Sequence, residues 1–436
     1  MSGPVRALRW ATSPALIVSL IFFGALLDFG GGSSASALFW ASLQCACAAY
    51  ALAWRPETLH PPRRLEVAAA ILYLALLAVA ALALTPVLPA PLDRYAALVE
   101  LARLTGLLAL CIVGWRVASD EAEATRLFGY LTLGCGLYAA WAIFAFLDAP
   151  AFVLGLEKQM HVERLSGSLL SANTAGSLFG AVGCALAVRL MRRIGRRIGS
   201  RRAQSARWGR DVGDAALLAV LWLALLLTVS RAAVTVSLAV LGLFLLLELR
   251  RYVKRRRLSA RSTAFASAAA AAGFLLIVAG SVSSQLEGQF GRLGADAVSR
   301  IGILEAYEPL IREVPPFGYG FGAFPTLNAS QVTQANFADL WNLGAAHNLL
   351  LQWWLEAGPV GTALGAAVLG LVLLRLALRL SGSETGRWRA ACALAAAAVL
   401  LAHNMVDYSL QAPAIAGLLA ILLGFGMGEA KRRPAP

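Results

Sequence analysis

Charged residues are scarce in this chain of 436 residues. Asp, Glu, Lys and Arg make up only 14% of it, whereas 59% of the residues are hydrophobic. Soluble domains carry about a quarter charged residues, because their surfaces must be hydrated. A soluble fold could not hide this much apolar surface, so the composition excludes a soluble globular protein.

Common catalytic motifs are missing as well. The chain has no Gly-x-Ser-x-Gly, no phosphate-binding loop and no dinucleotide fingerprint. It has four histidines, and no metal-ligand spacing occurs anywhere. We therefore expect no metal site and no cofactor.

The cysteines show no functional pattern either. No pair has metal-ligand spacing, and none lies in an outer loop where a disulfide would form. We interpret them as small residues that face lipid or a neighbouring helix. They are Cys45, Cys47, Cys111, Cys135, Cys184 and Cys392.

Long apolar runs, by contrast, recur along the whole chain. A run near 20 residues is long enough to span the roughly 30 Å of hydrocarbon in a bilayer. Twelve such runs predict an all-α polytopic integral membrane protein, a single membrane domain over residues 1–436 with about 12 transmembrane helices. The runs are 14–29, 35–54, 67–85, 98–115, 127–147, 172–191, 214–229, 232–249, 262–283, 347–374, 389–403 and 412–428.

The net charge of +14 is concentrated in short loops between these runs, chiefly residues 192–210 and 250–257. Such clusters fix orientation and contact anionic lipid, so we expect membrane lipids and not nucleic acid as partners. With Arg6 and Arg9 in the cytoplasm, all but eight of the 38 Lys and Arg residues lie on the inner side. The positive-inside rule then places both termini in the cytoplasm.

The first run allows an alternative. Arg6 and Arg9, an apolar core and the small residues 31–37 resemble a cleavable signal peptide. The alternation of loops works with the run kept, so we predict a retained helix.

Two outer connections are long, at about 148–171 and 284–346. The second contains EVPPFGYGFGAF (313–324). Loops of such length are usually functional or disordered. Its aromatic and apolar content favours an ordered loop that covers a site, with short amphipathic helices, the first beginning at Arg300.

The eight outer cations are the informative ones, because the positive-inside rule does not explain them. Arg231 lies between two apolar runs, where Ser230 and Arg231 must form a tight hairpin. A guanidinium near hydrocarbon is costly unless it is paired or faces a polar cavity. We interpret Arg231 as an anion ligand; snorkelling to lipid headgroups is the alternative. The eight are Arg94, Arg103, Lys158, Arg164, Arg231, Arg292, Arg300 and Arg312.

Arg164 precedes a predicted helix that could begin near Asn173. Helix starts offer free backbone N–H groups to anions, so both residues are candidate ligands. An ordinary capping segment is the alternative for Arg164, and a plain interfacial helix is the alternative for Arg300.

His347 begins a predicted membrane helix, and its side chain exchanges protons near neutral pH. It is a candidate general base, with a polar cap as the alternative. Glu356 lies about 13 Å deeper along that helix, too far to pair with His347. We interpret Glu-Ala-Gly-Pro at 356–359 as a kink whose carboxyl bonds to a neighbouring helix.

A second histidine, His403, ends the eleventh run. Asp407 follows one turn later, where the two side chains can meet on one helix face. A hydrogen-bonded cap is the alternative to a substrate-binding pair.

Four segments together resemble the O-antigen ligase and polymerase superfamily, which is related to bacterial oligosaccharyltransferases of proteins. They occur in the order RLSGSLLSANTAG (164–176), VSRAAV (229–234), Arg300 with PFGYGFGAF (316–324), and AHNLLLQWWLEAGPVG (346–361). The resemblance marks a catalytic region over about 160–360.

The resemblance implies transfer of a glycan from an undecaprenyl-diphosphate carrier at the periplasmic face of the bacterial inner membrane. The acceptor would be a glycan, lipid A–core or a protein. It implies that arginines hold the diphosphate, that the histidine acts at the acceptor hydroxyl, and that the reaction is metal-independent and inverting. The roles fall on Arg231, Arg300 and His347 as catalytic residues. Substrate-binding roles are expected for Arg164, Asn173, Tyr319, Asn348, His403 and Asp407.

Aromatic residues are expected to line the acceptor path, namely Tyr319, Phe321, Trp353 and Trp354. Two other classes stay open. A transporter or flippase of an anionic or lipid-linked substrate would place its charges near the midplane. A structural membrane protein would not need the outer arginines.

Transfer activity is expected to resist chelators, because the outer loops hold no carboxylate cluster that could bind a divalent ion. Turnover of the purified protein should be equal with and without EDTA. Loss of turnover that Mg²⁺ or Mn²⁺ restores would contradict this prediction.

Overall fold

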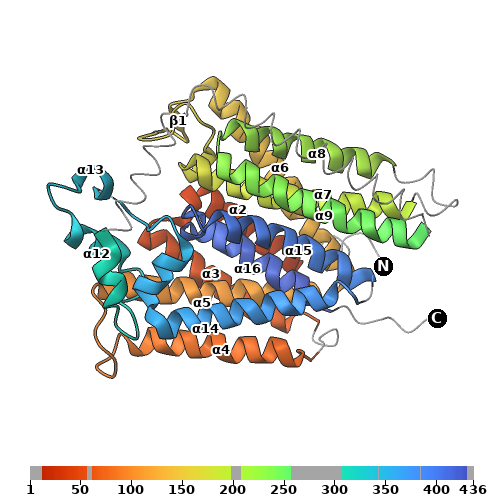
Figure 1. Ribbon diagram of the computed structural model, residues 1–436. Helices are drawn as coiled ribbons and strands as arrows, with labels where there is room; N and C mark the ends of the chain where they lie inside the picture. Colours follow the sequence, from red (N-terminus) through yellow and green to blue (C-terminus); the bar gives the residue numbers. More distant parts are fainter. Residues whose placement is uncertain are drawn as a thin grey trace.

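The computed structural model describes residues 12–55, 61–197, 208–256, 306–341, 343–382 and 384–429. Long helices run side by side in a bundle, and the short elements gather at one end of it (Figure 1). We call this the loop end. It carries the hairpin of β1 (Phe152–Val153) and β2 (Leu156–Glu157), with α12 (Phe324–Gln331) and α13 (Phe337–Leu340).

The long helices coincide with the predicted apolar runs, except for 262–283, which lies outside the described residues. Their apolar side chains favour helices because lipid offers the backbone no hydrogen-bond partner. The bounds are α2 (Pro14–Leu27), α3 (Ser34–Ala53), α4 (Arg64–Leu82), α5 (Arg94–Val117), α6 (Glu121–Asp148), α7 (Ala172–Arg197), α8 (Trp208–Leu227), α9 (Arg231–Arg256), α14 (Leu349–Arg379), α15 (Glu384–His403) and α16 (Pro413–Met427).

Seven of the described helices are long and apolar enough to cross a membrane, and α2 and α16 are shorter apolar helices. This confirms a helical, multi-pass membrane protein. The first residue of α2 and the last of α16 lie at the same end of the bundle, opposite the loop end (Figure 1). The span count of twelve and the cytoplasmic side of the termini stay predictions.

Helix α7 is the most buried of the described candidate membrane spans. Within its apolar part, 83% of the residues are buried. Small residues let its neighbours approach closely, as in other membrane helix pairs. A side chain at Gly176 would meet Ala233 of α9 at 2.9 Å, and one at Gly180 would meet Val399 of α15 at 3.4 Å. Helix α7 therefore fixes α9 and α15 relative to each other.

Helix α14 is kinked where Glu-Ala-Gly-Pro was expected to bend it. Gly358 has φ 62° and ψ −175°, outside the helical region. The buried Glu356 carboxylate accepts hydrogen bonds from Gln352 Nε2 at 2.8 Å and from the backbone N of Phe324, the first residue of α12, at 3.2 Å. The structural prediction for Glu356 is confirmed, and the bend seats the loop on α14.

The described part of the long loop is ordered, as predicted. Residues 306–312 are helical. Tyr307 is fully buried and donates to Asn328 Oδ1 at 2.5 Å, and Asn328 Nδ2 donates to the carbonyl of Leu340 at 2.8 Å. Arg300 and residues 284–305 lie outside the described residues.

The shorter loop departs from the all-α expectation by forming a small hairpin. Phe152 pairs with Glu157, and Val153 with Leu156, in antiparallel register. The two residues between the strands, Leu154 and Gly155, have φ of 50° and 82°. Two successive positive φ values are the conformation of a type I′ turn, which matches the twist of the strands. Hydropathy alone does not show so short a turn.

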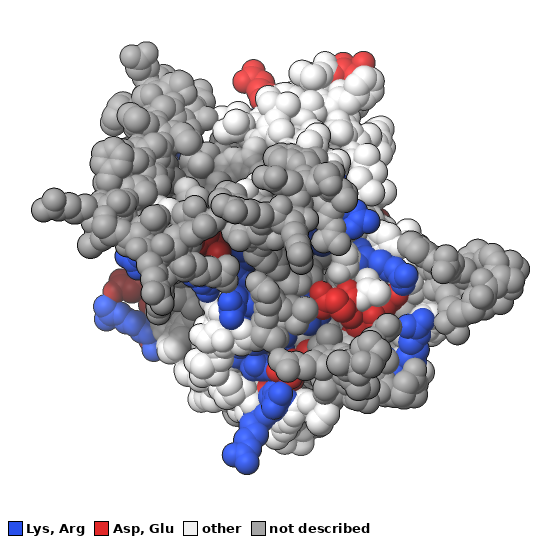
Figure 2. Space-filling model, turned by 90° about the vertical axis from the view of Figure 1, so that its right-hand side faces the viewer, with Lys and Arg blue, Asp and Glu red and all other residues white. Residues whose placement is uncertain are grey.

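The end opposite the loop end carries paired charges. Figure 2 views this end and shows acidic side chains set among basic ones. Arg375 bonds Glu66 at 2.8 Å and Glu429 at 2.6 Å. Arg192 bonds Glu248 at 2.8 Å. Mutual neutralisation lowers the cost of keeping these arginines largely buried.

A substitution at the kink tests how firmly the loop is seated. Gly358→Ala should destabilise the protein by about 1–3 kcal/mol, because φ is positive and a Cβ would meet Pro315 O and Pro316 O at 2.6 Å. Gly370→Ala on the same helix is the matched control, because a Cβ there meets nothing within 4 Å. Thermal unfolding in detergent should separate the two variants. Equal melting temperatures would show that the loop does not depend on the kink.

Candidate functional site

Arg164 ties the short loop to the hairpin between α8 and α9. Its Nε donates to the carbonyl of Thr228 at 2.9 Å and Nη2 to that of Val229 at 3.4 Å. Nη2 also donates to Asn173 Oδ1 at 2.8 Å, and Nη1 meets His161 Nδ1 at 3.0 Å. Every nitrogen of this guanidinium therefore has a protein partner. The geometry makes Arg164 an organiser of the hairpin.

Arg231 is the first residue of α9, directly after the hairpin. The prediction of a tight hairpin is confirmed, since only Thr228, Val229 and Ser230 separate the two helices. The Arg231 side chain is half-buried, and within the described parts of the chain no hydrogen bond or ion pair engages its guanidinium. A desolvated cation without a partner is costly, so this position is suited to an anionic ligand.

The other described outer cations are all engaged. Each donates to a carbonyl, a carboxylate or both, so none offers a wholly free cationic group. The bonds are Arg94 to Leu84 O (3.0 Å), Arg103 to Glu100 (2.7 Å) and Gln411 O (2.6 Å), Lys158 to Arg164 O (2.9 Å), and Arg312 to Glu308 (2.5 Å).

Electrostatics place a second arginine and an acid near Arg164. Burial lowers the pKa of the Arg164 guanidinium most, the negative charge of Asp407 raises it, and the positive charge of Arg231 lowers it. Arginine stays protonated despite such a shift. The charges of Arg231 and of the buried Asp407 therefore both act on Arg164.

His403 links that carboxylate to the central helix. Its Nδ1 lies 2.7 Å from Ser177 Oγ of α7 and 3.1 Å from Ser409 Oγ, and its Nε2 lies 3.9 Å from Asp407 Oδ2. His403 is fully buried and Asp407 is 3% exposed. Helix α15 ends at His403, so the pair meets across a turn and not on one helix face as expected. Full burial of the ring favours the capping role over contact with substrate.

His347 stands at the start of α14 beside that turn. Its ring packs edge-on against Tyr408 with 4.6 Å between centroids, and Tyr408 directly follows Asp407. Asn348 caps α14 by accepting from Leu351 N at 3.0 Å, and its Nδ2 donates to the carbonyl of Met405 at 3.0 Å. The contacts thus join His347 to the turn that carries Asp407, which in turn influences Arg164.

Backbone strain gathers at these residues. His161, Val229 and His347 have φ of 58°, 51° and 52°. Residues other than glycine rarely adopt positive φ, and β-branched residues such as valine do so least. Residues strained in this way cluster at functional sites. The three lie within three residues of Arg164, Arg231 and Asn348 in the sequence. Phe29, Arg55, Leu154 and Leu170 also have positive φ, so the site shares this feature with other turns of the chain.

The four aromatic residues expected to line the acceptor path lie between the long loop and α14. Tyr319 lies in the long loop, where its backbone N donates to Leu355 O at 2.8 Å and its hydroxyl to Leu310 O at 3.4 Å. Phe321 is buried against Trp353, and Trp354 donates to Ile311 O at 3.1 Å. These four side chains pack the loop onto α14.

Three residues of the site were not predicted from the sequence. His161 was not singled out, and Ser177 and Tyr408 lie in apolar or mixed stretches without a motif. Only the spacing His161-x-x-Arg164 offered a signal, because a short turn can bring such a pair together. The rest depend on the packing of α7 against α15.

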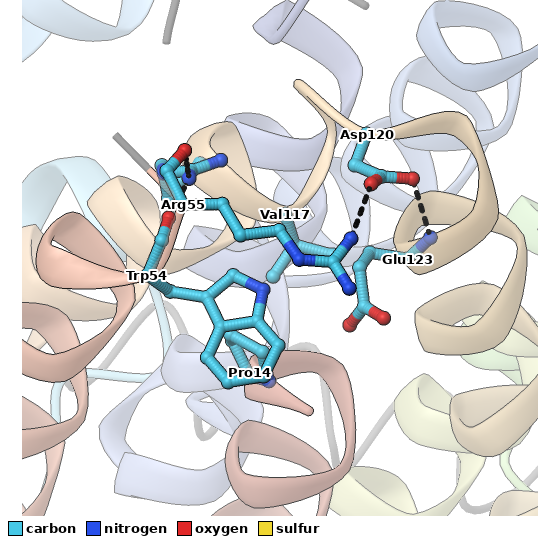
Figure 3. A pocket seen from close by; sticks show the side chains of 7 residues that line it. Pro14, Trp54, Arg55, Val117, Asp120 and Glu123 are labelled. Atoms are coloured by element: carbon cyan, nitrogen blue, oxygen red, sulfur yellow. Dashed lines mark hydrogen bonds and ion pairs between the residues drawn. The ribbon is translucent and has the colours of Figure 1, made fainter. Parts of the chain in front are cut away.

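A polar cavity at the opposite end of the bundle is not a rival site. Trp54, Arg55, Asp120 and Glu123 line it (Figure 3), and it is large enough for about one water molecule. Arg55 Nη1 lies 3.3 Å from Asp120 Oδ2. Arg55 and Arg116 balance Asp120 and Glu123 in this cavity, so it offers no net positive charge to an anionic ligand.

No group of three or more His, Cys, Asp or Glu side chains that could hold a metal ion occurs among the described residues. The chelator experiment remains the test of metal independence.

One family model matches part of the chain. The family model described as O-antigen ligase matches residues 216–366, which include Arg231, Arg300, Tyr319, His347 and Asn348. This match confirms the resemblance to the O-antigen ligase and polymerase superfamily over that region. No curated protein matches the chain.

Protonation of His161 should weaken the fold. Burial, then the positive charges of Arg164 and Lys158, lower the pKa of its imidazole. As pH falls below the ordinary value of about 6.5, the unfolded chain takes up a proton that the folded chain resists, so stability falls. Melting temperatures in detergent at pH 7.5 and 5.0 should therefore differ less in His161→Gln than in the wild type. An equal difference would mean that His161 does not contribute.

Proposed function

We propose that this chain, with its O-antigen ligase region, transfers or polymerises a glycan from an undecaprenyl-diphosphate-linked donor. The acceptor is a saccharide, lipid A–core or a protein. The site lies at the periplasmic face of the bacterial inner membrane, and the reaction is metal-independent and inverts the anomeric centre. The observation that carries the proposal is the half-buried Arg231, the one described outer cation without a protein partner.

A diphosphate attached to a lipid suits this position. The phosphate group reaches only the membrane edge, where the α8–α9 hairpin holds Arg231. A guanidinium offers parallel N–H donors that match two phosphate oxygens. Arg164 contributes positive potential, although its N–H groups already bond protein acceptors. Arg300 completes the phosphate site by resemblance to the family.

His347 has the chemistry for the acceptor side. In the proposed step, the acceptor hydroxyl gives its proton to the imidazole while its oxygen bonds to the anomeric carbon. The bond between that carbon and the diphosphate oxygen breaks, and its electron pair stays on undecaprenyl diphosphate. Arg231 neutralises the charge that develops there. A single displacement of this kind inverts the configuration.

The remaining polar residues hold these groups in place. Asn173 accepts from Arg164, Asn348 caps α14, and His403 bonds Ser409, two residues after Asp407. Their positions support indirect roles in substrate binding. Preorganisation of this kind keeps reacting groups aligned, which contributes to catalysis.

The function is tested by incubating the purified protein with lipid-linked glycan and an acceptor, without ATP or added metal. A glycosylated product supports the enzyme. Movement of glycan into a protected compartment without a product would instead show a transporter.

Variants of Arg231 and His347 should fail in different ways. Arg231→Ala should lose donor binding, and Arg231→Lys should not restore it, because lysine keeps the charge but lacks the planar fork. His347→Ala should bind the donor but transfer about 10²- to 10⁴-fold more slowly.

A donor-binding assay beside a transfer assay on folded variants makes the comparison. If His347→Ala lost donor binding as fully as Arg231→Ala while Arg231→Lys stayed active, His347 would belong to the phosphate site and the assigned roles would be reversed.

A further inference from the structure

An exposed aromatic pair lies at α13, apart from the charged site: Phe337 begins the helix and Trp341 follows its last residue. The rings of Phe337 and Trp341 are stacked, with 4.7 Å between centroids and 20° between planes. Phe337 is 48% exposed and Trp341 66%. Where burial is described, no other tryptophan of this chain is classed as exposed. Exposing large apolar side chains to water is unfavourable, and an exposed apolar patch often marks a binding surface.

The pair rests on a rigid support. Leu340, between the two aromatic residues, is fully buried in a cluster with Tyr307, Phe324 and Ala346. Asn328 Nδ2 donates to its carbonyl at 2.8 Å. The backbone N of Trp341 donates to the carbonyl of Phe337 at 2.9 Å. The stacked rings are therefore held in a fixed orientation before any ligand arrives.

The surroundings argue against a lipid anchor. Helix α13 stands beyond the ends of the long helices and not alongside them (Figure 1). The sequence has no Lys or Arg from 313 to 374, whereas interfacial anchors usually place cations beside aromatic residues. Exposed Thr333 and Gln334 offer neutral hydrogen-bonding groups instead, and the indole N–H of Trp341 donates to no described residue.

We infer that Phe337 and Trp341 form a stacking platform for the pyranose rings of a glycan substrate. A sugar presents a flat face of C–H groups that packs on an aromatic ring, while its hydroxyls bond neutral polar groups. The platform lies six residues before His347, and Leu340 shares its buried cluster with Ala346 beside that histidine. It would hold the chain of sugars whose end reaches the site. This inference rests on the proposed function.

The test measures glycan binding and glycan transfer separately on the full-length protein. The binding probes are the acceptor glycan and the delipidated donor glycan, each followed by saturation-transfer NMR. The transfer assay gives KM for donor and acceptor. Trp341→Ala should raise KM for one of the two glycans about tenfold and weaken binding of the same glycan, with kcat unchanged. The glycan whose KM and binding change shows whether the platform holds the sugars of the donor or those of the acceptor.

Trp341→Tyr keeps an aromatic face and should retain most of the affinity. Phe152→Ala is the matched control, since Phe152 is 50% exposed at the same end of the bundle but lies on the β1–β2 hairpin. It should behave as the wild type.

The outcomes separate the two proposals. Wild-type transfer with unchanged KM and binding in Trp341→Ala overturns the platform and leaves the function standing. Glycan binding that depends on Trp341, without any transfer by the wild type, overturns the function and supports the platform. Equal losses in Trp341→Ala and Phe152→Ala would also overturn the platform, because the effect would not be specific.

Discussion

The hydrogen bonds from Arg164 to the carbonyls of Thr228 and Val229 are the interaction on which the site depends. Helix ends leave carbonyl groups unsatisfied, and here a charged donor from another loop satisfies two of them. The same guanidinium binds Asn173 at the start of α7. It thereby fixes the hairpin against α7 and sets where α9, and with it Arg231, begins. Because Arg164 satisfies the carbonyls of the hairpin, the guanidinium of Arg231 is not needed to bond them.

The second constraint is the kink of α14. Because Gly358 leaves the helical region, the backbone of the long loop can bond to α14 at Leu355 and Glu356, and Gln352 holds the Glu356 carboxylate. The loop is thus built onto the helix that His347 precedes. The Glu356 carboxylate holds the long loop on α14. The start of the same helix, at His347, stays in contact with the turn that carries Asp407.

Much of this arrangement follows from the sequence because it depends on local rules. Apolar runs predict the helices, Ser-Arg between two such runs predicts the α8–α9 hairpin, and Gly-Pro predicts the kink. Whether each arginine is hydrogen-bonded within the protein cannot be predicted from such local rules. Arg164 and Arg231 are both outer cations in the sequence, yet one is fully bonded and the other is not, because the carbonyl partners of Arg164 come from the packing of α8 against a distant loop. The meeting of His403 with Ser177 likewise depends on how α7 and α15 pack, and Tyr319 belongs to the loop core because its neighbours bond to α14.

In the proposed mechanism, Arg231 binds the diphosphate of a lipid-linked glycan while His347 faces the acceptor. A cryo-EM structure of the protein in lipid nanodiscs with an undecaprenyl-diphosphate-linked glycan tests it most directly. We expect phosphate oxygens within hydrogen-bond distance of the Arg231 guanidinium and the anomeric carbon on the side of His347. Diphosphate bound elsewhere, with Arg231 in contact only with lipid headgroups or water, would contradict it.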